Sequence, residues 1–144
     1  MRTLLVALVL VAFVGCGGRN NSSAPIPETK YKAPLQSIVS VGDTLGTAPS
    51  DTLQLGRMRS GEIVAQAVGV INNSPTPLVI TRTESSCGCT DIDYPSQPIG
   101  VGDTARIAIR FDSQGFYGWQ FKRVRLYTSA ALSPITIYIE AEVE

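Results

Sequence analysis

Alternation of apolar and polar residues is the feature that most limits what this chain can fold into. It is clearest at residues 135–143, ITIYIEAEV, where every second position is apolar: Ile135, Ile137, Ile139, Ala141 and Val143. Successive side chains of a β-strand point to opposite faces, so this pattern predicts a strand with one buried face. Strands of this kind are typical of antiparallel sheets that expose their other face to water.

Further segments with the same period follow from residue 35 onward. Residues 104–111 alternate in the same way, with Ile107, Ile109 and Phe111 on the expected buried face. Residues 62–71 are apolar on both faces and predict a central strand, which ends at the turn signal Asn72-Asn73-Ser74-Pro75. We also expect strands at residues 36–41, 52–55, 78–83 and 117–127.

The expected strand at 117–127 carries apolar residues on both faces. Trp119 and Phe121 share one face, whereas Val124 and Leu126 share the other. This change of phase predicts a β-bulge near Lys122 or Arg123, because one extra residue would turn both pairs to the same side. Trp119 is then expected in the core.

The whole pattern predicts an all-β fold. No window gives a convincing amphipathic helix, and nine prolines interrupt the chain. About seven short strands joined by turns rich in Gly, Pro and Asn predict an immunoglobulin-like antiparallel β-sandwich over residues 35–144. A β-barrel is the structural alternative.

The amino terminus has the features of an export signal. Arg2 is followed by an apolar run at residues 4–14 and by the small Gly15 before Cys16. As a helix the run would rise only about 16 Å, against a hydrocarbon core of roughly 30 Å. The Val14-Gly15-Cys16 ending resembles the lipobox of bacterial lipoproteins, which implies cleavage before Cys16 and lipid attached to it. We therefore expect a lipoprotein signal peptide at 1–15; the alternative is an ordinary signal peptide with an incidental cysteine.

Residues 16–34 are expected to link the lipidated cysteine to the domain. The stretch GGRNNSSAPIPETKYKAP is too poor in apolar residues to offset the entropy of ordering it. A flexible chain of this length reaches about 25 Å. The sequence thus predicts a flexible tether that holds the sandwich away from a membrane surface.

Charge and composition exclude several functions. The 12 basic and 12 acidic residues balance, so no basic excess is available to neutralise the phosphates of nucleic acid. Histidine is absent, which removes the usual near-neutral general base and the usual nitrogen ligand of zinc or copper. Without histidine no Ser-His-Asp triad can form. We expect a non-enzymatic protein that needs no cofactor.

Residues 52–143 resemble a known family. The pieces that carry the resemblance are Leu55-Gly56, Gly61-Glu62, Val70-Ile71-Asn72-Asn73, Pro77-Leu78-Val79-Ile80, Ser86-Cys87-Gly88-Cys89-Thr90, Pro98-Ile99, Val101-Gly102-Asp103, Phe111-Asp112, Gly115 and Gly118. The most specific is Cys-Gly-Cys-Thr after a Pro-Leu-x-Ile strand. Together they resemble the bacterial domain of unknown function 1573. This resemblance implies a small immunoglobulin-like module of exported proteins, used for adhesion, assembly or scaffolding, and supplies no catalytic residues.

The pair Cys87 and Cys89 admits four interpretations. A local disulfide is compatible with the spacing, since Gly88 can adopt backbone angles forbidden to other residues, and it would contribute about 1.6 kcal/mol before strain. The other interpretations are two reduced thiols, a metal site for a soft ion such as Cu(I), and thiol–disulfide exchange. The sequence leaves these open.

Two functions remain. The first is a lipid-anchored cell-envelope module that binds or scaffolds another envelope protein or peptide; the alternative is a periplasmic thiol-redox or copper-handling protein that uses Cys87 and Cys89. The expected partners are the membrane, through Cys16, and an envelope polypeptide. Gly17 stands where an Asp would favour inner-membrane retention, so we expect an outer-membrane lipoprotein that faces the periplasm.

Overall fold

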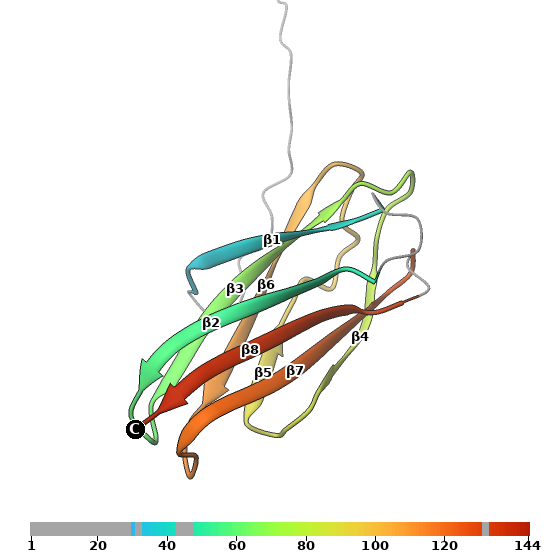
Figure 1. Cartoon of the computed structure of the whole chain (residues 1–144). Helices are drawn as coiled ribbons and strands as arrows, with labels where there is room; N and C mark the ends of the chain where they lie inside the picture. Colours follow the sequence, from blue (N-terminus) through green and yellow to red (C-terminus); the bar gives the residue numbers. More distant parts are fainter. Residues whose placement is uncertain (1–29, 31–32, 43–47, 131–132) are drawn as a thin grey trace, which may run out of the picture.

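The structure is a computed structural model that describes residues 30, 33–42, 48–130 and 133–144 (Figure 1). The described part contains eight strands: β1 (Leu35–Val41), β2 (Ser50–Met58), β3 (Ile63–Asn72), β4 (Ile80–Ser85), β5 (Thr90–Asp93), β6 (Thr104–Asp112), β7 (Gly118–Thr128) and β8 (Ile135–Val143). They form two four-stranded sheets that pack as layers of a β-sandwich. Among these residues, no helix is long and apolar enough to cross a bilayer.

The order of strands is β1-β3-β6-β5 in one sheet, which we call sheet A, and β2-β8-β7-β4 in the other, sheet B. The predicted all-β sandwich is confirmed, but the sheets are mixed rather than purely antiparallel. β1 runs parallel to β3, and β2 runs parallel to β8. The reason is connectivity: the chain crosses to sheet B for β2 before it returns for β3, so β1 and β3 can run in one direction. Alternation reports which face is buried, not which way a neighbouring strand runs.

The core lies between the two sheets and follows the predicted alternation. All five apolar positions of β8 are buried, as are Ile107, Ile109 and Phe111 of β6. Leu53, Val68, Val70, Val124 and Leu126 complete this interior from the neighbouring strands. The expected strands are thus all present, with ends shifted by a few residues. The additional strand is β5, whose four residues are too short for a recognisable period.

Trp119 is not in the core, so that prediction is wrong. Trp119 is 75% exposed and Phe121 is 61% exposed. β7 pairs with β8 without a register shift from Gly118 to Leu126, so the expected bulge is also absent. In an uninterrupted strand Trp119 and Phe121 share a face with Arg123, and the residues of opposite parity, Val124 and Leu126, point into the core.

The packed part of the chain begins shortly before β1. Ala33 is buried against Ala67 and Ala108 on the outer face of sheet A, and the Pro34 carbonyl accepts a hydrogen bond from Ala67 N–H at 2.9 Å. Lys30 N–H donates to the Asp93 carboxylate of β5. Residues 1–29 lie outside the described residues, and with them the predicted signal peptide, Cys16 and most of the predicted tether.

Candidate functional site

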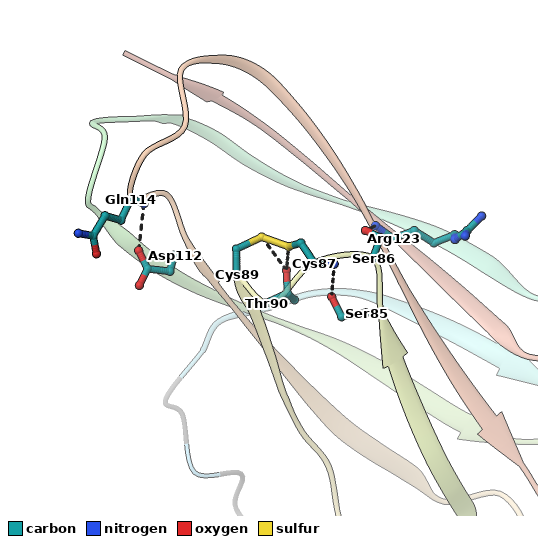
Figure 2. Close-up of a disulfide and its surroundings, with 8 residues drawn as sticks. All are labelled: Ser85, Ser86, Cys87, Cys89, Thr90, Asp112, Gln114 and Arg123. Carbon is teal, nitrogen blue, oxygen red and sulfur yellow. Dashed lines mark hydrogen bonds between the residues drawn. A yellow bond between two sulfur atoms is a disulfide. The ribbon is translucent and has the colours of Figure 1, made fainter.

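The Cys-Gly-Cys segment forms the turn that carries the chain from sheet B to sheet A (Figure 2). At its start, Ser86 N–H donates to the Arg123 carbonyl, and Arg123 N–H donates to Ser86 Oγ, both at 2.9 Å. At its end, the Cys89 carbonyl accepts a hydrogen bond from Asp112 N–H at 2.9 Å. The turn is therefore tied to β7 of one sheet and to the end of β6 in the other.

Cys87 and Cys89 are joined by a disulfide whose Cα atoms lie 5.2 Å apart. The Thr90 hydroxyl lies 3.5 Å from Cys87 Sγ and 3.8 Å from Cys89 Sγ (Figure 2). Both cysteines are half-buried, and Gly88 between them is exposed. Cys89 also packs against the buried cluster of Met58, Phe111, Ala141 and Val143. The disulfide thus packs against the buried interior through Cys89, while Gly88 of the same turn remains accessible to solvent.

This surrounding limits the chemistry of the pair. The segment after Cys89 is the strand β5, so no helix amino terminus is available to lower the pKa of a released thiol. Over the described ranges, no group of three or more His, Cys, Asp or Glu side chains could hold a metal ion. Of the nearby carboxylates, Asp93 accepts the Lys30 hydrogen bond, and the Asp91 carboxylate accepts one from Ile92 N–H at 3.0 Å. The pair can brace the turn or exchange with an incoming thiolate.

Exposed aromatic side chains lie at the start of β7, the strand to which this turn is hydrogen-bonded. Tyr117, Trp119 and Phe121 are 74%, 75% and 61% exposed, and the Phe121 ring stacks on Tyr138 with centroids 5.2 Å apart. This exposed group was not predicted from the sequence, because a residue as large as Trp119 is expected in the core. The signal that could have found it is the shared parity of Trp119 and Phe121 with Arg123 and Arg125.

The class of protein follows from this fold together with a family match. The family described as "Protein of unknown function (DUF1573)" matches residues 47–143, which include every strand except β1. The chain belongs to this family, as the Cys-Gly-Cys-Thr block and its flanking pieces predict. No curated protein matches the chain in a sequence comparison.

Solved structures share the fold at low identity. A crystal structure of a protein of unknown function from Porphyromonas gingivalis W83 superposes with a TM-score of 0.57 at 17% identity, over 63% of this chain and 43% of that one. The VesB protease of Vibrio cholerae gives 0.55 at 17% identity, over 65% of this chain and 30% of the protease chain. The aligned region spans less than half of either protein. The likeness shows a common β-sandwich.

Proposed function

We propose that the chain is a lipid-anchored module of the bacterial cell envelope that binds another envelope protein or peptide without catalysing a reaction. The observation that carries the proposal is the order of its parts. An export-signal pattern ends at Cys16, and a compact sandwich follows after a polar linker. The sandwich supplies edge strands, which accept added strands from partner polypeptides. The resemblance to export-associated modules agrees with this arrangement.

The anchor is tested by metabolic labelling with a clickable palmitate analogue in the native host. We expect the full-length protein to carry the label and to sediment with outer membranes on a sucrose gradient. Cys16→Ser should lose essentially all of the label, because it removes the acceptor sulfur. Cys87→Ser with Cys89→Ser is the matched control and should keep it, since these sulfurs lie in the folded domain. Label that survives Cys16→Ser, or an unlabelled native protein, would contradict the anchor.

A second candidate function is thiol–disulfide exchange, with copper handling as its variant. The observation that favours it is a half-buried disulfide in a surface turn. A partner dithiol would attack one sulfur, form a mixed disulfide and release the other sulfur as a thiolate. The second thiol of the partner would then resolve this bond, which leaves Cys87 and Cys89 reduced and the partner oxidised. The two thiolates would offer soft ligands for Cu(I).

Alkylation of free thiols followed by mass measurement distinguishes the binding function from thiol–disulfide exchange. If the protein is a binding module, rapid acid quenching of cells should trap the pair fully oxidised, and metal analysis should find no copper. Cys87→Ser with Cys89→Ser should lower the free energy of unfolding by only about 1–2 kcal/mol, because the closed loop is three residues long. A mixed oxidised and reduced population in cells, or stoichiometric copper that the double variant loses, would favour the redox function instead.

A further inference from the structure

β7 extends beyond the strand that pairs with it. β7 has 11 residues and β4 has 6, and β4 pairs only with Val124 to Thr128. The last tie between them is the pair of hydrogen bonds between Arg123 and Ser86, after which the chain turns through the disulfide toward sheet A (Figures 1 and 2). In the described chain, residues 118–122 therefore pair with β8 on one side and with no strand on the other.

The backbone groups on that side can be assigned from the register. Arg123 directs its N–H and C=O toward β4, and alternate residues of a strand face the same neighbour. Trp119 and Phe121 thus direct their backbone N–H and C=O to the same side, where none of the described residues hydrogen-bonds to them. The backbone N–H and C=O groups of Gln120 and Lys122 are directed toward β8 instead. The result is an open strand edge about 17 Å long.

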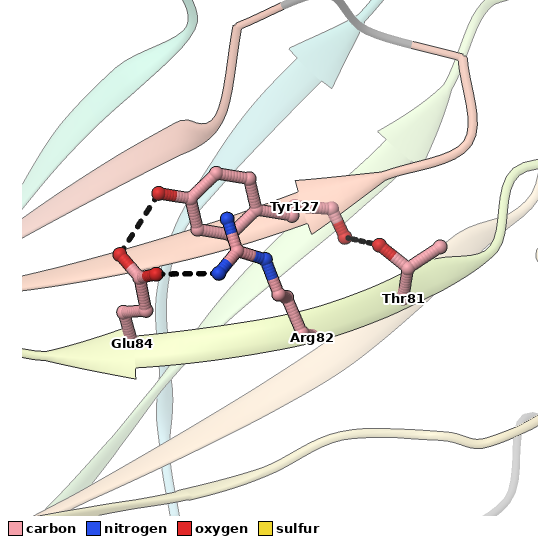
Figure 3. A network of polar contacts seen from close by, with 4 residues as sticks. All are labelled: Thr81, Arg82, Glu84 and Tyr127. Atoms are coloured by element: carbon pink, nitrogen blue, oxygen red, sulfur yellow. Dashed lines mark hydrogen bonds and ion pairs between the residues drawn. The ribbon is translucent and has the colours of Figure 1, made fainter.

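The aromatic side chains along β7 also differ in how far neighbouring residues cover them. Opposite β4, Tyr127 is covered: the Arg82 guanidinium lies 3.7 Å from its ring centroid, and its hydroxyl donates to Glu84 at 2.8 Å (Figure 3). Arg82 also pairs with Glu84 at 2.7 Å. Trp119 and Phe121 lie where β4 has already ended, and both remain mostly exposed. β4 thus protects the aromatic residue it passes, and the open edge leaves two aromatic residues unprotected.

The outer edges of β2, β5 and β4 are protected by side chains or are polar, whereas the edge strand β1 exposes Leu35 and Ile38. On β2, the Gln36 side-chain amide accepts from Gln54 N–H and donates to the Gln54 carbonyl, both at 2.9 Å. On β5, the Asp91 carboxylate accepts a hydrogen bond from the Ile92 N–H. The exposed side chains of β4 are Thr81, Arg82 and Ser85, none of which is apolar. Residues 118–122 combine unpaired backbone groups with two large exposed aromatic side chains, Trp119 and Phe121.

We propose that residues 118–122 of β7 bind an extended segment of another polypeptide as an added strand in line with β4. Only a polypeptide offers alternating N–H and C=O groups at the spacing that Trp119 and Phe121 require. Its residues opposite these two would be aromatic or β-branched, since such cross-strand pairs are favourable. This inference rests on the proposed binding function and names its surface and the chemistry of its partner.

The test begins with a random eight-residue peptide library selected against the full-length exported protein in nanodiscs, with empty nanodiscs as counter-selection. Enriched peptides should carry apolar residues at alternate positions. Hydrogen exchange read at single residues should show the Trp119 and Phe121 amides exchanging fast in the free protein and at least about tenfold slower with peptide bound. N-methylation at the peptide residues that face β7 should weaken binding about tenfold or more, because each methyl removes a donor.

Matched variants confine the effect to this edge. Trp119→Ala with Phe121→Ala should weaken peptide binding at least about tenfold, whereas Ile38→Ala, which truncates a similarly exposed residue on β1, should leave it within about twofold. The inference is overturned if no peptide is enriched, if bound peptides leave both amides unprotected, or if a dimer of this chain protects them without peptide. Any of these results leaves the anchored binding module intact, because a partner could still be captured through another face.

Discussion

We expect Phe111→Ala to lower the free energy of unfolding by about 3–5 kcal/mol. Phe111 is fully buried in a cluster with Met58, Ala141 and Val143, and its ring lies 5.9 Å from that of Phe116. Removing the ring gives up its transfer free energy and leaves a cavity that the two sheets cannot collapse to fill. Urea unfolding followed by circular dichroism measures the loss.

Phe121→Ala is the matched control, since it makes the same chemical change on the outer face of sheet B. Because Phe121 is 61% exposed, the variant loses mainly the stacking of its ring on Tyr138, and we expect a cost of about 1 kcal/mol or less. Equal losses in the two variants would contradict the assignment of the inner and outer faces of the sandwich.

The second large effect is expected at Asn72, whose buried side chain uses all of its hydrogen-bonding capacity. Its amide nitrogen donates to the carbonyls of Thr76 and Ile99 at 2.9 and 3.0 Å. Its oxygen accepts from Ser74 N–H at 3.0 Å and from Ser74 Oγ at 2.6 Å. Asn72→Asp keeps the shape but sets a carboxylate against two carbonyl oxygens, which we expect to cost about 3–5 kcal/mol at pH 7.

The sign of the pH dependence follows from the same contacts. Burial and the two carbonyls raise the pKa of the introduced carboxyl above its unfolded value of about 3.9. The penalty is therefore largest at neutral pH and shrinks as the pH falls through the raised pKa. Asn73→Asp is the matched control on the exposed neighbour and should cost about 1 kcal/mol or less at either pH. Thermal unfolding of both variants at pH 7 and pH 4.5 tests this; a similar loss in both, independent of pH, would refute it.

Much of the fold was predictable because alternation is a direct consequence of burial on one face. The inward set of β8 and the residues Ile107, Ile109 and Phe111 of β6 were identified from sequence alone. The turn after β3 was also predictable, and Asn72 shows why: its side chain holds that turn by bonding to Ser74 and Thr76. Sequence patterns that arise from local burial or local hydrogen bonding therefore predict the structure of their own segment.

What could not be predicted depends on contacts between distant segments. The parallel pairing of β1 with β3 is set by how the chain crosses between layers, and no local pattern encodes it. The size of Trp119 favours a place in the core, because aromatic residues bury large areas, yet its position in the strand directs it outward. The open edge of β7 arises where β4 ends and turns toward sheet A, a feature visible only once the sheets are assembled.

The central claim, that the anchored domain binds another polypeptide along the open edge of β7, is tested most directly by photo-cross-linking in living cells. A benzophenone amino acid would replace Phe121 on the open edge of β7 or, as control, Val101, which is 57% exposed in a loop between other strands. The account predicts discrete adducts with another envelope polypeptide from position 121 and none from position 101. The absence of adducts from position 121, or identical adducts from both positions, would contradict it.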